Sequence, residues 1–162
     1  MTPRMSPVLV LAVALTFAPA EDPECGVVGL AHIDSAAYAV VNGMRESAGA
    51  TGGEPATRFF AEPLASALEE DYRRRRRGEA TRLAADWLSG GGAMNATTDL
   101  SLYSLNRSGV DDMDMSLGFT NAEGETVHRR LKLGCHDGRW RIDYIFLHPE
   151  GEYVNDLLAG KP

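Results

Sequence analysis

The chain has little that could hold it in a membrane. Its apolar run Val8–Phe17 has 10 residues, whereas a membrane-spanning helix needs about 20. Arg4 precedes this run and Ala18-Pro19-Ala20 follows it, which is the pattern of a cleavable secretory signal. No later run is long enough to span a bilayer, so we expect no transmembrane anchor in the mature chain. The expected organisation is a signal peptide, a flexible segment and one domain, over residues 1–20, 21–34 and 35–162.

Cysteine is scarce, since the chain has only Cys25 and Cys135. Asp22-Pro23-Glu24 stands before Cys25 in place of the small and aliphatic residues of a lipoprotein signal, so we expect a soluble mature chain from about Glu21. In an oxidising compartment the two cysteines can form a disulfide. The chain-entropy model puts its stabilisation at no more than about 4.7 kcal/mol. The alternative is two unpaired thiols.

The chain lacks an excess of positive charge. It has 16 basic and 23 acidic residues and a net charge of −7, which argues against a sequence-independent nucleic-acid binder. The run Arg73–Arg77 is the one basic cluster. An anion-binding patch is one interpretation of it. A solvated helix is favoured, because the acidic residues Glu69–Asp71 lie four positions before Arg73–Arg75 and can pair with them.

Motifs for metals, cofactors and catalysis are missing as well. The histidines are scattered, the acidic residues near position 112 lack the spacing of a calcium loop, and no Gly-x-Ser-x-Gly motif occurs. Two cysteines without a neighbouring histidine pair do not make a zinc site. We therefore predict no metal, no cofactor and no assignable catalytic residue.

Hydrophobic periodicity changes from helical to alternating near the middle of the chain. Helices are expected at 36–46, from about 55 to 77 with a break at Pro63, over one or two turns at 82–88, and at 152–158. Strands are expected at 100–106, 112–120, 126–135 and 139–147. In the last strand the apolar residues Trp140, Ile142, Tyr144 and Phe146 are predicted to share one face, with Trp140 and Ile142 in the core.

This order of elements predicts an α+β fold: N-terminal helices packed on a curved four-stranded antiparallel sheet, with a short C-terminal helix. The final strand carries Asp137, Gly138, Trp140, Ile142, Asp143 and Ile145, and Leu157-Leu158 closes the last helix. On these residues the chain resembles the nuclear transport factor 2-like superfamily of cystatin-like α+β cones, and within it a bacterial family of exported domains of unknown function. Where that family commonly has an acidic pair before the final isoleucine, this chain has Asp143-Tyr144. The resemblance implies a cone with a pocket at its open end and a periplasmic or secreted location.

Several residues could line such a pocket. Arg129 is the most informative, because it shares strand parity with Val127 and Leu131, and a charge on a core face is costly unless it is paired. It either lines a pocket or lies at the end of the sheet, where it reaches solvent. The predicted ligand-binding residues are Tyr38, Trp87, Tyr103, Arg129 and Tyr144.

These features favour a binding module that recognises a protein partner or a small ligand, such as an immunity or envelope-accessory protein. The alternative is a small lyase or isomerase that uses a carboxylate and a hydrogen-bonding tyrosine in the cone. A binding module should have a filled cone and an exposed apolar patch, whereas an enzyme should have a deep pocket with a carboxylate or histidine. The sequence also allows a homodimer.

Overall fold

The computed structural model describes Cys25 and residues 33–50, 53–107, 109 and 111–161. The predicted signal peptide and the predicted start of the mature chain near Glu21 lie outside these residues. The helices are α1 (Ile33–Ala50), α2 (Leu64–Arg76) and α3 (Val154–Ala159), with 3-10 turns η2 (Thr57–Phe59) and η3 (Met94–Ala96). The strands are β1 (Thr98–Arg107), β2 (Asp112–Thr120), β3 (Thr126–His136), β4 (Arg139–His148) and β5 (Glu152–Tyr153).

The two long helices follow their apolar spacing. In α1 the predicted apolar positions Ala37, Val40, Val41 and Met44 are all buried, because residues spaced by three and four share one face of a helix. The helix begins and ends beyond the predicted range 36–46. Helix α2 begins directly after Pro63, as the predicted break requires.

The strands form one antiparallel sheet in the order β1-β2-β3-β4-β5. The prediction of four strands was therefore one short, since Glu152–Tyr153 pairs with β4 before α3 begins. The predicted bounds of β2 are confirmed to the residue. A two-residue turn at Asp137-Gly138 joins β3 to β4, with a positive φ at both residues, which suits the right-handed twist of the hairpin.

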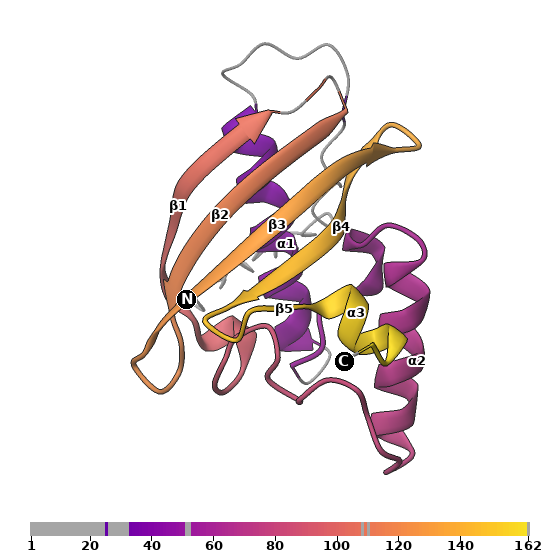
Figure 1. Cartoon of the computed structure of the whole chain (residues 1–162). Helices are drawn as coiled ribbons and strands as arrows, with labels where there is room; N and C mark the ends of the chain where they lie inside the picture. Colours follow the sequence, from indigo (N-terminus) through magenta and orange to yellow (C-terminus); the bar gives the residue numbers. More distant parts are fainter. Residues whose placement is uncertain (1–24, 26–32, 51–52, 108, 110, 162) are drawn as a thin grey trace, which may run out of the picture.

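The molecule is built in two layers. Helix α1 lies behind the sheet in Figure 1, and α2 and α3 lie beside its β4 edge. The face of the sheet toward α1, here called the inner face, contributes Met113, Met115, Leu131, Leu133 and Ile142 to the core, each at most 1% exposed. The opposite side is here called the outer face. No helix among the described residues is long and apolar enough to cross a membrane.

The stretch Arg82–Leu88 forms turns and not the predicted helical turns. Its backbone groups bond elsewhere: the buried Asp71 carboxylate accepts hydrogen bonds from the amides of Arg82 and Leu83, at 2.6 and 3.3 Å. These contacts come from α2, eleven and twelve positions away in the sequence. A buried carboxylate satisfied by backbone amides thus shapes this loop.

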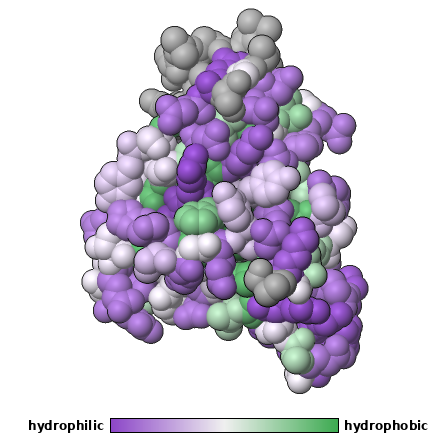
Figure 2. Space-filling model, viewed as in Figure 1, coloured by the Kyte–Doolittle hydropathy of each residue, from purple (hydrophilic) through white to green (hydrophobic). Residues whose placement is uncertain are grey.

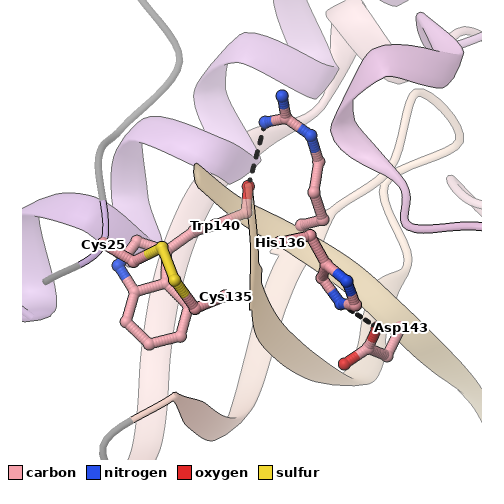
Figure 3. Close-up of a disulfide and its surroundings, with 6 residues drawn as sticks. Cys25, Cys135, His136, Trp140 and Asp143 are labelled. Carbon is pink, nitrogen blue, oxygen red and sulfur yellow. Dashed lines mark hydrogen bonds and ion pairs between the residues drawn. A yellow bond between two sulfur atoms is a disulfide. The ribbon is translucent and has the colours of Figure 1, made fainter. Parts of the chain in front are cut away.

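The predicted disulfide between Cys25 and Cys135 is confirmed. Its Cα atoms are 5.8 Å apart, within the usual range for the bond. The amide of Cys25 also donates to the carbonyl of Gly138 at 2.9 Å. Figure 3 shows the bridge beside Trp140, whose backbone pairs with Cys135 across the β3–β4 hairpin. The bridge fastens Cys25 to the end of the sheet.

Candidate functional site

A bulge in β4 decides which side chains reach the outer face. Leu133 pairs with Ile142, but the preceding Lys132 pairs with Tyr144, so Asp143 is an extra residue in β4. An extra residue reverses the alternation of faces beyond it. Ile145 and Leu147 therefore enter the core, and Tyr144 is 49% exposed.

The prediction that Tyr144 and Phe146 share the face of Trp140 and Ile142 was wrong for this reason. Trp140 and Ile142 lie in the core as predicted, at 5% and 0% exposure. Beyond the bulge, the cross-strand register places Phe146 opposite Arg130 and His148 opposite His128. Phe146 is thus an aromatic residue on the open side of the sheet.

Two hollows lie next to each other on the outer face. The first, here the aromatic hollow, has a volume of about 370 Å³ and is lined by Asp114, Arg130, Lys132, Tyr144, Phe146 and Tyr153, with Asn155 and Asp156 at its α3 side. The second, here the histidine hollow, has a volume of about 410 Å³ and is lined by Ser116, Leu117, His128, Arg129, Arg130, Phe146 and His148. They share Arg130 and Phe146 and so border one another, and together they are here called the groove. Figure 2 shows this face, with hydrophobic surface near its middle surrounded by hydrophilic residues.

Ring contacts order the side chains along this groove. The ring centroids of Phe146 and Tyr153 are 5.0 Å apart, and those of His128 and His148 are 6.0 Å apart in an edge-to-face arrangement. Tyr103, which is 61% exposed, stacks 5.3 Å from His128. These distances fall in the range in which rings attract one another, so the groove is lined by side chains already in contact.

The charges of the groove are unevenly divided. Two of the charged residues form ion pairs: Lys132 Nζ lies 3.8 Å from Asp112 Oδ1, and Asp156 Oδ1 lies 3.4 Å from Lys161 Nζ. The side chain of Arg130 has no hydrogen bond or ion pair with any residue that the structure describes, although its backbone pairs within the sheet. The lining of the histidine hollow includes no carboxylate, whereas Asp114 and Asp156 line the aromatic hollow. One end of the groove is therefore basic and the other is mixed.

Arg129 lies on the inner face and is 2% exposed. Its guanidinium donates to the carbonyls of Leu88, His128, His148 and Trp87 at 3.0, 2.9, 3.0 and 3.2 Å. Burial lowers its pKa, and the Glu150 carboxylate, 3.6 Å away, opposes that shift. Its burial contradicts the expected position at a solvated strand end, because backbone carbonyls satisfy the charge within the protein. A pocket-lining role stays a prediction, since Arg129 is among the residues that line a hollow of the sheet.

The five predicted ligand-binding residues do not meet at one place. Trp87 is buried and contacts Arg129 through its carbonyl. Tyr103 and Tyr144 lie on the outer face, and Tyr38 lies on α1 next to Leu100 and Leu102 of β1. A ligand role for these five residues stays a prediction. The residues that sequence reasoning left out are His128, Arg130, Phe146, His148 and Tyr153.

One signal in the sequence could have found part of this groove. His128, Arg130 and Lys132 share one strand parity in β3, and the opposite parity holds Val127, Leu131 and Leu133, which marks the first set as outward-facing. They become a site only when Tyr144 and Phe146 join them. That step depends on the bulge at Asp143, which the alternating pattern does not show.

A histidine–aspartate pair joins β3, which carries Cys135 of the disulfide, to β4. His136 Nε2 and Asp143 Oδ1 are 2.7 Å apart, and Figure 3 shows the pair beside the hairpin of Cys135. Such a pair can activate a nucleophile. The described cysteines are both bonded in the disulfide, so neither supplies a thiol here.

The arginine run of α2 is paired with acidic residues. Arg74 and Arg75 pair with Glu70 and Asp71 four positions earlier, as predicted. Arg76 pairs with Glu54 and Glu69, at 3.0 and 3.1 Å. The hydrogen bond from Arg74 lowers the pKa of Glu70, and nearby arginines add to this. The preferred interpretation of a solvated helix, and not an anion-binding patch, is thus supported.

No group of three or more histidine, cysteine, aspartate or glutamate side chains with the geometry of a metal site occurs in the described part of the chain. The two histidines of the groove have no third such ligand there. The chemistry that the groove offers is therefore contact with aromatic faces and hydrogen bonding by Arg130 and the imidazoles.

Comparison with known proteins gives little. No protein-family model matches the chain, and no curated protein is similar to it. Among solved structures, the chain is similar to a phospholipid-binding protein from Ralstonia solanacearum, solved with a phospholipid. The identity is 14% and the TM-score 0.42, over 80% of this chain and 82% of that one. Similarity at this level shows neither a shared fold nor a shared ligand.

Proposed function

We propose that this protein is an exported binding module, not an enzyme, and that it holds its ligand in the groove of the outer face. One observation carries the proposal: the inner face is filled by core side chains, while the outer face keeps an open groove lined by contacting rings. Each hollow has the volume of a small-molecule site, about 300–1,000 Å³. Exposed aromatic surface next to a few polar groups is typical of binding surfaces.

The lyase or isomerase alternative requires a pocket on the inner side. The described inner-face residues there are packed side chains, from Met113 to Ile142, and Arg129, the charged residue among them, bonds to backbone carbonyls. No observation favours a reaction there, so we do not carry this alternative further.

The proposal keeps two sequence-based expectations. Membership of the nuclear transport factor 2-like superfamily is supported by the order of helices before an antiparallel meander and by the hairpin at Asp137-Gly138. A periplasmic or secreted location is supported by the Cys25–Cys135 disulfide, since such bonds persist in oxidising compartments. An immunity or envelope role would use the same groove for its ligand.

The test maps binding on the two faces. The mature protein is titrated, below the critical micelle concentration, with three dodecyl amphiphiles whose heads are anionic, neutral and cationic, while amide chemical shifts are followed by NMR. We expect at least one of them to shift the amides of Arg130, Tyr144 and Phe146 and to leave those of buried α1 residues such as Val40 and Met44 unchanged.

A pair of tyrosine variants provides the matched control. Tyr144→Ser removes an exposed ring from the groove, and Tyr38→Ser removes one from α1. The first should weaken amphiphile binding several-fold, and the second should leave it unchanged. Shifts confined to buried α1 residues, or greater sensitivity to Tyr38→Ser, would contradict the proposal.

A further inference from the structure

We infer that the ligand of the groove is a single amphiphile with an anionic head, held by Arg130 between His128 and His148, and an apolar body lying over Phe146 and Tyr153. This inference rests on the proposed function and names the class of molecule that the groove takes.

Arg130 has a guanidinium without an ion-pair partner among the described residues. Its guanidinium is exposed on the outer face, and no described residue gives it an ion pair. Lys132, the next cation on the same side of β3, has Asp112 3.8 Å away. An arginine presents a planar set of donors that fits carboxylate and phosphate oxygens in pairs. Arg130 is thus the cation of the groove that is free to bind an anion.

Two histidines lie in the same hollow as the Arg130 guanidinium. The histidine hollow places His128 and His148 beside Arg130, and its lining has no acidic residue. Both imidazoles can donate a hydrogen bond to an anion. The whole chain has a net charge of −7, so a pocket lined by basic and imidazole groups stands out against an acidic protein. Local charge of one sign selects a ligand head of the opposite sign.

The acidic residues of the aromatic hollow determine how an anionic ligand would be oriented in the groove. Asp114 and Asp156 line the aromatic hollow and would repel an anion placed there. That same hollow offers Phe146 and Tyr153, with ring centroids 5.0 Å apart, and the exposed ring of Tyr144. An anionic head is therefore favoured in the histidine hollow and an apolar body in the aromatic hollow. Arg130 and Phe146 border both hollows and mark the junction of head and body.

Helix α2 presents a second cluster of arginines, which differs from Arg130 in its ion pairs. The arginines of α2 form ion pairs with Glu54, Glu69, Glu70 and Asp71. An anion binding there would have to displace a carboxylate from each guanidinium. Arg130 requires no such exchange, so the four arginines of α2 are a poorer anion site than Arg130 on the outer face.

The experiment uses the mature protein with its disulfide intact. Dodecyl phosphate, dodecanoate and dodecyltrimethylammonium have the same tail and differ in the charge of the head. Isothermal titration below their critical micelle concentrations should give binding of both anions and binding of the cation at least about tenfold weaker, because a hydrogen-bonded charge at Arg130 is worth about that factor.

Two charge-removing variants locate the head. Arg130→Gln should weaken binding of dodecyl phosphate about tenfold. Arg73→Gln removes the same charge from α2, outside the groove, where Arg73 pairs with Glu70 at 2.6 Å, and it should change binding less than about twofold. Equal losses in the two variants would overturn the placement of the head.

Three further probes distinguish the sources of the anionic group. Inorganic phosphate and butanoate have the head without the body and should bind at least about tenfold more weakly than their dodecyl counterparts. Vesicles of anionic phospholipid test a membrane surface in place of a free molecule. Binding to vesicles without binding of any dodecyl anion would overturn the inference.

The outcomes separate this inference from the proposed function. If all three dodecyl compounds bind equally to the outer face and Arg130→Gln has no effect, the anionic head is wrong and the binding module stands. If none of the three shifts an outer-face amide in the NMR titration, both fail. Selective binding of the two anions, lost in Arg130→Gln and retained in Arg73→Gln, supports both.

Discussion

Arg129 and Arg130 are neighbours in the chain but have opposite roles. Arg129 points to the inner face, where four backbone carbonyls accept its hydrogen bonds. Arg130 points to the outer face, where no described residue pairs with it. In a strand, successive side chains alternate between faces. The comparison teaches that burial and the availability of partners, more than residue type, decide whether an arginine stabilises the fold or remains free for a ligand.

The two faces of the sheet differ in the same way. The inner face is lined by aliphatic and methionine side chains that are shielded from water. The outer face carries tyrosine, histidine and phenylalanine rings together with unlike charges. Stability should therefore depend on the inner face and binding on the outer face. The following substitutions test that division.

The largest loss in the free energy of unfolding is expected for Trp140→Ala. Trp140 is 5% exposed and packs in the core beside the disulfide, and truncating a buried tryptophan costs about 3–5 kcal/mol. The free energy of unfolding from urea titration measures this loss. Tyr144→Ala, on the outer face of the same strand, should cost less than about 1 kcal/mol. A loss below about 1 kcal/mol for Trp140→Ala would mean that the inner face does not carry the stability.

An intermediate loss in the free energy of unfolding is expected for Arg129→Met. The substitution keeps an apolar stem but leaves the carbonyls of Trp87 and Leu88 without their donor, which should cost about 2–3 kcal/mol. The matched variant Arg130→Met should change the free energy of unfolding by less than about 0.5 kcal/mol. Denaturation of both proteins by urea measures the contrast, and equal losses would remove the distinction between the two arginines.

The smallest loss of stability is expected for Gly118→Ala on the outer face. A Cβ at Gly118 would collide with the ring of Tyr103. Because Tyr103 is exposed, its ring can turn away, and the cost should stay below about 1 kcal/mol. The ring would then leave His128, now 5.3 Å from it. NMR cross-peaks between the Tyr103 and His128 rings should disappear while the Tm falls only slightly; unchanged cross-peaks would show that the ring does not depend on this glycine.

Local patterns predicted much of the fold. The alternation of Met113, Met115, Leu117 and Phe119 defines β2, and all four side chains are buried as that pattern requires. The spacing of Ala37 to Met44 likewise predicted the buried side of α1. In both cases one face of a regular element packs on the core, and the period of the element is visible in the sequence.

The candidate site was harder to predict because it depends on contacts between distant residues. The register of β3 and β4 shifts at Asp143, and without that shift Phe146 would be assigned to the core. The loop at Trp87 and Leu88 is held by Arg129, more than forty positions away in the sequence. Neither contact leaves a local period. The sequence pattern thus assigned Arg129 to the right face but could not show which groups satisfy it.

The bond between Cys25 and Cys135 also changes the topology of the covalent chain. It joins positions 110 residues apart, so α1, α2, β1, β2 and most of β3 lie within one covalent ring, from which β4, β5 and α3 extend as a tail. A single protease cut inside this ring leaves both pieces attached to each other. A cut in the exposed turn at Arg77-Gly78 would yield a two-chain molecule in which the disulfide still joins the two pieces.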